Sequence, residues 1–191
     1  MSAADLRPDV AMPDDPYDAI PPGLEVPRRR TPHTALELRT ALVLGHRETT
    51  GADIPPARLR AAWCMLCVEH AAHHGGRLVH GGAVWNENLG NINAKGWPGD
   101  WTLLEAIEVL HGHRVPITQR LRAHSGPVPG AADYWAVLLA RWPAAVEAMD
   151  AGDLEGVAHA LKAGSYYTAA EHDYALGLVT WARDYDKRWA K

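Results

Sequence analysis

Apolar residues recur every three to four positions over much of the chain, which is the spacing of one buried helix face. Residues that cap helices precede several of these stretches, namely Thr34, Asp153 and Thr168, with Asp100 or Thr102 before a further one. The pattern predicts helices over residues 35–46, 56–73, 102–110, 131–139, 143–149, 153–161 and 169–189. The chain is therefore expected to be mainly α.

Two stretches interrupt the helical pattern. Residues 75–99 are rich in glycine and asparagine, and we expect loops there with a short hairpin. Residues 115–130 hold several prolines and glycines and are expected to be irregular. These stretches predict a small irregular or β-hairpin lobe beside the helices.

The first 33 residues differ from the rest because they contain seven prolines and a run of three arginines. Such a segment cannot continue a helix and has little apolar surface to bury. We expect residues 1–33 to form an extended arm, either disordered or docked on a partner. Residues 34–191 are then expected to form one folded domain, a size that suffices for a single core.

Charge and hydropathy exclude some classes of partner. The net charge of −4 at pH 7 provides no general field for polyanions, so nucleic acid is not an expected partner. No stretch approaches the ~20 apolar residues that cross a bilayer, and the N-terminus lacks the pattern of a secretory signal. We expect synthesis in the cytoplasm without a signal peptide.

The aromatic residues and the cysteines add two further expectations. Eight tryptophans and six tyrosines occur without phenylalanine, and their flat faces with polar edges suit sugar binding, although most are expected in the core. Cys64 and Cys67 lie one helical turn apart with no second cysteine pair to complete a zinc site. Buried free thiols are the favoured interpretation.

Glu69 is the first candidate for chemistry. It follows the apolar stripe of the helix predicted over residues 56–73 and lies on its shoulder, close to the helix end. Desolvation at an apolar cleft and the negative end of a helix both raise the pKa of a carboxyl, so Glu69 could hold a proton near neutral pH. The alternative is an ordinary exposed glutamate.

An asparagine-rich stretch follows. It contains four asparagines, at Asn86, Asn88, Asn91 and Asn93, whose neutral donors and acceptors can form hydrogen bonds with sugar hydroxyls and N-acetyl groups. Gly90 permits a tight backbone turn among them. The alternative is a turn that its own side chains stabilise.

At this point the chain resembles a known family. Glu69 followed by the string Trp-Asn-Glu-Asn-Leu-Gly-Asn-Ile at residues 85–92 looks like the glucosaminidase and lytic-transglycosylase-like branch of the lysozyme superfamily. Members carry a catalytic glutamate at a helix end, then an Asn-Asn-Gly-type loop. Residues 164–168 followed by Tyr174-Ala175 are similar to the family's Gly-Tyr-x-Thr and Tyr-Ala pattern. The resemblance covers roughly residues 57–186.

The resemblance implies a lysozyme-like domain that cleaves peptidoglycan glycan strands without a cofactor. Glu69 would be the general acid. Tyr166 or Tyr167 would line the cleft near the scissile bond. Of the two, Tyr166 matches better when the pattern is aligned on Thr168. The remaining substrate-binding candidates are Asn86, Asn88 and Asn91, with Trp85, Trp97 and Trp101 as stacking platforms.

The second carboxylate that most glycosidases need is less evident. Glu87 inside the asparagine-rich stretch is the favoured candidate, and Asp100 is another. Without a second acid, the substrate's N-acetyl group could act as nucleophile. Alternatively, the sugar's own hydroxyl could close an anhydro ring.

Two other functions remain open. The chain departs from the family between Glu69 and Trp85. There Glu69, His70, His73, His74 and His80 could form the metal site of a wall amidase or peptidase, although no native metal is favoured. The other alternative is a non-catalytic wall-binding or structural component of a particle, docked through the proline-rich arm.

The expected partner is bacterial peptidoglycan, with phage or secretion-apparatus proteins at the arm. An endolysin or virion-associated lysin would act in the wall or periplasm after release by a holin, a phage particle or a secretion apparatus.

Overall fold

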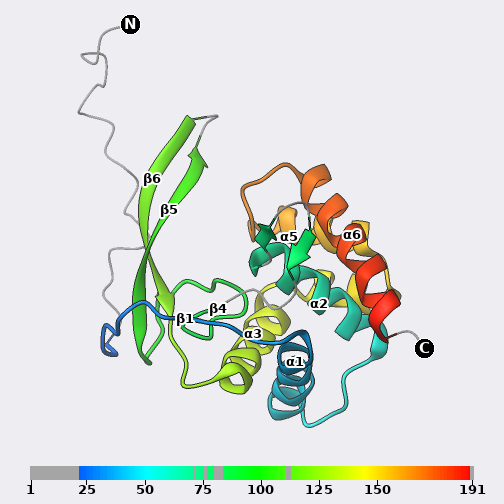
Figure 1. Cartoon of the computed structure of the whole chain (residues 1–191), viewed down its shortest axis with the longest axis horizontal. Coiled ribbons are helices and arrows are strands. Elements are labelled where there is room, and N and C mark those ends of the chain that lie inside the picture. The colour runs from blue at the N-terminus through cyan, green and yellow to red at the C-terminus, as the bar shows by residue number, and fades with distance from the viewer. Residues whose placement is uncertain (1–21, 71, 75–76, 80–83, 111–112, 190–191) are drawn as a thin grey trace, which may run out of the picture.

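A computed structural model describes residues 22–70, 72–74, 77–79, 84–110 and 113–189. This part of the chain forms six helices and three separate two-stranded antiparallel sheets (Figure 1). The helices are α1 (Ala35–Thr50), α2 (Pro56–His70), α3 (Pro127–Arg141), α4 (Pro143–Ala151), α5 (Leu154–Ala163) and α6 (Glu171–Trp189). The strands pair as β1 (Arg30–Thr31) with β4 (Val84–Trp85), β2 (Ala72–His74) with β3 (Arg77–Val79), and β5 (Trp101–Leu110) with β6 (His113–Arg122).

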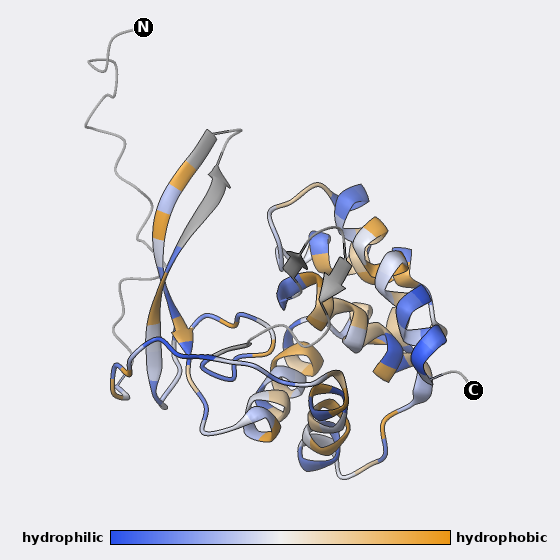
Figure 2. Cartoon of the chain, viewed as in Figure 1, coloured by the Kyte–Doolittle hydropathy of each residue, from blue (hydrophilic) through white to orange (hydrophobic). Residues whose placement is uncertain are grey.

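The core lies among the helices, where α1 packs on α3, α2 on α6 and α4 on α5. Its largest fully buried side chains include Trp63, Met65, Tyr134 and Trp135. In Figure 2 the outer turns of α6 are mainly hydrophilic, because this helix covers α2 with one face and meets solvent with the other. The prediction of a mainly α fold with a small β-hairpin lobe is confirmed.

Most helix boundaries follow from local signals. Thr34 caps α1 through a complete capping box with Glu37, as its sequence position predicted. The helix continues past the predicted end at His46 to Thr50, and ends at Gly51 in the left-handed region. Asp153 caps α5 by accepting the Gly156 amide, also as predicted.

Other predicted boundaries were also wrong. Helix α2 ends at His70, three residues before the predicted end at residue 73, because residues 72–74 form strand β2. The stretch predicted as irregular over residues 115–130 contains most of β6 and the start of α3 at Pro127.

The predicted helix over residues 102–110 was also wrong, because these residues belong to β5, which pairs with β6 along ten positions from Trp101↔Arg122 to Leu110↔His113. This hairpin projects away from the helices in Figure 1. Pro116 is tolerated within it because each strand of a two-stranded sheet has a free edge.

Residues 22–33 pair first with the start of β5 and then with β4, and we call them the strap. The Val26 amide donates to the Trp101 carbonyl at 2.8 Å, and the Trp101 amide donates to the Leu24 carbonyl at 3.0 Å. Further along, β1 pairs with β4 and leads into α1. The strap therefore joins the lobe to the helical part through backbone hydrogen bonds within the chain.

Cys64 and Cys67 are buried free thiols on α2, as predicted. Burial raises the pKa of Cys64 to about 12 and raises that of Cys67 further, so both stay protonated. Within the described residues, no helix combines the length and the apolar character that a membrane crossing requires.

Candidate active site

Glu69 lies in the last turn of α2, beside the helix C-terminus. The residue is partly exposed, while protein atoms surround its carboxyl closely. Burial raises the pKa of Glu69 from 4.5 to about 7, and the Asn91 amide and the Tyr174 hydroxyl oppose part of this rise. Glu69 is therefore placed to hold and release a proton near neutral pH.

Residues 86–93, which we call the asparagine turn, are fixed against this helix end by two contacts. Asn91 donates through Nδ2 to Glu69 Oε2 at 3.2 Å, with its own backbone in the left-handed region at φ 49. His70 Nε2 lies 2.8 Å from the Leu89 carbonyl oxygen, so this nitrogen carries the proton. Burial lowers the pKa of His70 to about 4, which keeps the ring neutral.

Three tyrosines lie near the Glu69 carboxyl. The pKa values of Tyr134, Tyr166 and Tyr174 are all raised, first by burial and then by the charge of Glu69. The Tyr174 hydroxyl approaches the carboxyl without completing a well-formed hydrogen bond in the described part of the chain. The phenols stay protonated and are therefore neutral neighbours of Glu69.

Tyr166 links this group of tyrosines to the asparagine turn. Its hydroxyl lies 3.5 Å from the Gly90 carbonyl oxygen, and its ring packs edge-on against Trp142. A Cβ on Gly90 would lie 2.6 Å from the buried Tyr134 ring, so only glycine permits this approach. The structure thus brings Tyr166, Asn91 and Glu69 together.

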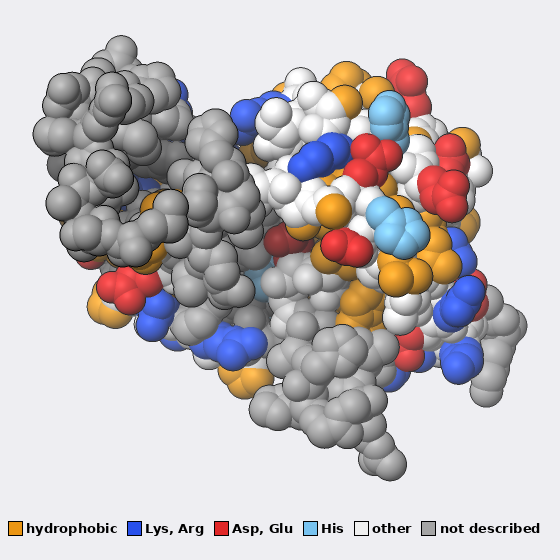
Figure 3. All heavy atoms as spheres, turned by 90° about the horizontal axis from the view of Figure 1, so that it is seen from above, with side chains coloured by type: hydrophobic (Ala, Val, Ile, Leu, Met, Phe, Trp, Pro, Cys, Tyr) orange, Lys and Arg blue, Asp and Glu red, His pale blue; other side chains and the backbone are white. Residues whose placement is uncertain are grey.

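One face of the molecule is hollowed. Figure 3 shows a hollow in the middle of this face, with an acidic side chain visible inside it. Partial exposure of Glu69, Asn91 and Tyr166 is consistent with side chains that a ligand could reach.

The side chains of Asn86 and Asn88 form hydrogen bonds with the backbone, unlike that of Asn91, which contacts Glu69. Asn88 is fully buried, and its amide bonds to the backbone of Ile92 and Arg122. Asn86 donates to the Pro27 carbonyl and accepts the Arg29 amide. These contacts favour the self-stabilised turn for Asn88, and they give Asn86 a structural role as the link between the turn and the strap.

Glu87 is buried, and its carboxylate is engaged by the strap. Oε2 lies 2.7 Å from His33 Nε2, and Oε1 lies 3.8 Å from an Arg29 guanidinium nitrogen. The residue also adopts a left-handed backbone at φ 59, which is unusual for glutamate. These contacts favour a tethering role, and catalysis by Glu87 stays a prediction.

The aromatic candidates have different surroundings. Tyr167 stacks on Tyr174 with ring centroids 4.0 Å apart, and its hydroxyl donates to the Ala158 carbonyl. Trp101 is buried under the strap and donates to the Gly23 carbonyl. Trp97 is partly exposed, with the Arg122 guanidinium over its ring. The Trp85 side chain lies outside what the structure describes.

The histidine cluster falls largely outside the described atoms, because the side chains of His73 and His74 and the whole of His80 are not included. Within the described residues, no group of three or more potential metal ligands occurs.

Sequence reasoning did not single out Tyr134, Tyr174 or His70 for this site. Tyr134 comes from α3 and Tyr174 from α6, so only the packing of these helices around α2 brings them to Glu69. The Tyr174-Ala175 pattern was the one available signal for Tyr174.

No family model and no curated protein matches the chain. Solved structures with a similar fold include a peptidoglycan hydrolase mutant from Sphingomonas sp. A1, which is 22% identical over 73% of this chain and 92% of that chain, with a TM-score of 0.49. The glycoside hydrolase domain of FlgJ from Salmonella typhimurium is 18% identical over 82% and 91%, with a TM-score of 0.49. A C-terminally truncated form of that domain is 21% identical over 80% and 98%, with a TM-score of 0.47.

These structures are of the kind that the sequence resemblance suggested. At such low identities and TM-scores the likeness concerns the arrangement of the chain alone. The function proposed below rests on the geometry around Glu69.

Proposed function

We propose that this chain is a glycosidase that cleaves the glycan strands of bacterial peptidoglycan, with Glu69 as general acid. The observation that carries this proposal is a glutamate whose pKa is raised to about 7 at a partly exposed position. Cleavage of a glycosidic bond requires a donor that still holds its proton at working pH and can reach the leaving oxygen. A glutamate with an ordinary pKa of 4.5 would have lost this proton.

Asn91 and the tyrosines would support the acid. The hydrogen bond from Asn91 fixes one oxygen of Glu69, leaving the other to carry the proton toward a substrate. Tyr166 is partly exposed beside the turn and would line the cleft. There its phenol would orient the substrate's N-acetyl group or stabilise the positive charge of the transition state. Tyr134 and Tyr174 would keep the carboxyl dry.

The surroundings of Glu87 favour a reaction with one protein carboxylate. Its oxygens are engaged by His33 and Arg29, so its use as base or nucleophile would require the strap to release it. Attack by the substrate's own N-acetyl group, or closure of an anhydro ring by a sugar hydroxyl, needs no second acid. Glu69 can serve as the acid in either route.

A turbidity assay on purified cell walls tests the proposal. Glu69→Gln removes the titrating proton while keeping the shape and an acceptor for Asn91, so the initial rate of lysis should fall by ~10²–10⁴-fold. In the wild type, lysis should decline as the pH rises through about 7, because the acid then loses its proton.

Glu147→Gln, an exposed change on α4, is the matched control and should lyse walls at the wild-type rate. Lysis by the Glu69→Gln variant at an undiminished rate would refute the assignment. Loss of lysis with a chelator would instead favour the metal-dependent amidase. Mass spectrometry of the released fragments separates hydrolytic from anhydro products and identifies the linkage cut.

A further inference from the structure

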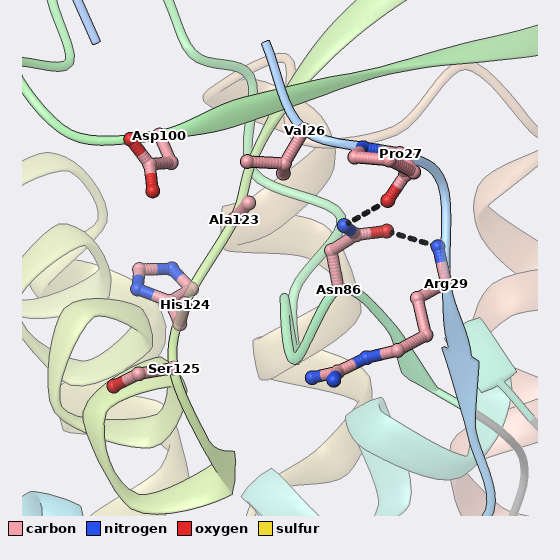
Figure 4. A pocket seen from close by; sticks show the side chains of 8 residues that line it. All are labelled: Val26, Pro27, Arg29, Asn86, Asp100, Ala123, His124 and Ser125. Carbon is pink, nitrogen blue, oxygen red and sulfur yellow. Dashed lines mark hydrogen bonds between the residues drawn. The ribbon is translucent and has the colours of Figure 1, made fainter. Parts of the chain in front are cut away.

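A pocket lies between the strap and the β5–β6 lobe, and Glu69 is not among the residues that line it. It has a volume of about 380 Å³, which is at the small end of the range for ligand sites. The strap forms one wall, and Asp100 with residues 123–125 forms the other. Figure 4 shows the side chains of Arg29, Asp100 and His124 around this space, which we call the strap pocket.

The strap wall is held rigidly by Asn86. The Asn86 amide donates to the Arg29 carbonyl at 2.8 Å, and the Arg29 amide donates to Asn86 Oδ1 at 2.8 Å. Asn86 Nδ2 also donates to the Pro27 carbonyl at 3.0 Å. These bonds fix the Arg29 backbone, while its side chain remains 65% exposed and touches Glu87 only at 3.8 Å. Most of the guanidinium donors therefore remain accessible to a ligand.

The opposite wall is also held by backbone bonds. The Ala123 amide donates to the Asp100 carbonyl at 2.8 Å, and the His124 amide donates to the Asn86 carbonyl at 2.9 Å. The Asp100 carboxylate accepts the Leu24 amide through Oδ1 at 3.2 Å, and no other partner is found within the described residues. A ligand would thus meet the exposed guanidinium of Arg29 on one side and an available carboxylate oxygen of Asp100 on the other.

The chemistry of these walls suits the end of a peptide better than a sugar. Among the described residues, no tryptophan or tyrosine lines the pocket, so a sugar would find no indole or phenol face to stack on. Arg29 matches a free carboxylate, and Asp100 matches an ammonium group. Val26, Pro27 and Ala123 offer a small apolar surface between the charges.

We propose that the strap pocket binds the carboxylate end of a short peptide, with Arg29 at the carboxylate and Asp100 at an amine, and that its ligand is the peptide carried by the wall glycan. The second half of this statement rests on the proposed function. The asparagine turn connects the two sites, because Asn86 lines the pocket and Asn91 contacts Glu69. Five residue steps separate them, so their Cα atoms lie within ~18 Å. A peptide in the pocket could thus hold its strand near the acid.

Titration of the full-length protein with a dipeptide tests the pocket directly. We expect D-alanyl-D-alanine to bind with millimolar affinity and to shift the backbone amide NMR signals of Arg29, Asn86 and His124. Arg29→Gln should weaken binding about tenfold and abolish the preference for a free over an amidated carboxylate. Asp100→Asn keeps the bond to Leu24 and, in a lysyl-D-alanyl-D-alanine tripeptide, should abolish the preference for a free over an acetylated side-chain amine.

Arg47→Gln is the matched control, because Arg47 on α1 is similarly exposed, at 66%, and does not line the pocket. The control should bind like the wild type. Equal binding of the free and amidated dipeptides, or equal affinity in the Arg29→Gln variant, would overturn the pocket's proposed specificity. Preferential binding of L-alanyl-L-alanine would overturn the wall peptide as the source of the ligand.

A second experiment, which measures wall cleavage, separates this proposal from the proposed function. The wild type should cleave intact walls faster than walls stripped of their peptides, and Arg29→Gln should lower this ratio about tenfold. Glu69→Gln should lose cleavage but bind the dipeptide normally. Charge-dependent binding without any cleavage by the wild type would remove the wall role and leave a peptide site. Cleavage without dipeptide binding would overturn the pocket alone.

Discussion

At the scale of single residues, Glu69 derives its chemistry from its neighbours. The carboxyl lies at a helix end among Tyr134, Tyr166 and Tyr174, which exclude water without supplying positive charge. Only the weak donors of Asn91 and Tyr174 favour the ionised form. The charged state is therefore disfavoured, and the proton stays on the carboxyl to about pH 7.

This environment predicts a pH-dependent cost in stability. The unfolded chain loses the Glu69 proton near pH 4.5, whereas the folded chain holds it to about pH 7, so the free energy of unfolding falls as the pH rises through this window. Glu69→Gln abolishes this titration. The variant should match the wild type near pH 4.5 and exceed it by up to about 3 kcal/mol at pH 8.

Urea unfolding at both pH values measures this difference. Glu147→Gln, on the exposed side of α4, should change little at either pH. A Glu69→Gln variant less stable than the wild type at pH 8 would contradict the raised pKa.

At the scale of elements, local signals explain the helix ends and long-range pairing explains the strands. Thr34 and Glu37 satisfy each other's donors within four residues, so their capping box is readable from sequence. The stretch 102–110 contains good helix formers, yet it forms β5 because β6 offers a partner along ten positions. Helix propensity amounts to a few tenths of a kcal/mol per residue, which a sheet partner can override.

The capping box predicts the effect of a single substitution. Thr34→Ala removes the side-chain acceptor of the Glu37 amide and should lower the free energy of unfolding by about 1 kcal/mol. Thr40→Ala, at an exposed interior position of α1, should instead be neutral or slightly stabilising because alanine is the better helix former. Chemical denaturation of both variants measures the contrast, and equal stabilities would argue against the cap.

At the scale of the whole molecule, the strap connects the lobe to the helices and covers groups that water would otherwise reach. Trp101 is buried under residues 23–26, and the Glu87 carboxylate meets His33 inside the protein. The asparagine turn lies between the strap and Glu69, with Asn86 facing one and Asn91 the other. The strap therefore supports the turn that contacts the candidate acid.

Removing the strap should destabilise the molecule strongly. Deletion of residues 2–33 exposes Trp101 and leaves the buried polar groups of Asn86 and Glu87 without partners, at ~1–3 kcal/mol for each group. We expect a loss of at least about 3 kcal/mol in urea unfolding. Deletion of residues 2–21 keeps every described contact of the strap and should be close to the wild type. Equal stability of the two truncated chains would show that the strap does not contribute to the free energy of unfolding.

The sequence alone determined the helical class, the capping of α1 and α5, the burial of Cys64 and Cys67, and the placement of Glu69 at a helix end, because each depends on residues within a few positions of one another. Only the tertiary structure decided the β5–β6 hairpin, the docking of the strap and the tyrosines around the acid. These features depend on contacts between residues far apart in the chain. The local periodicity of apolar residues does not indicate which distant surface will cover a side chain. Glu69 and Asn91, for example, are 22 residues apart, and their meeting follows from the docking of the turn on α2.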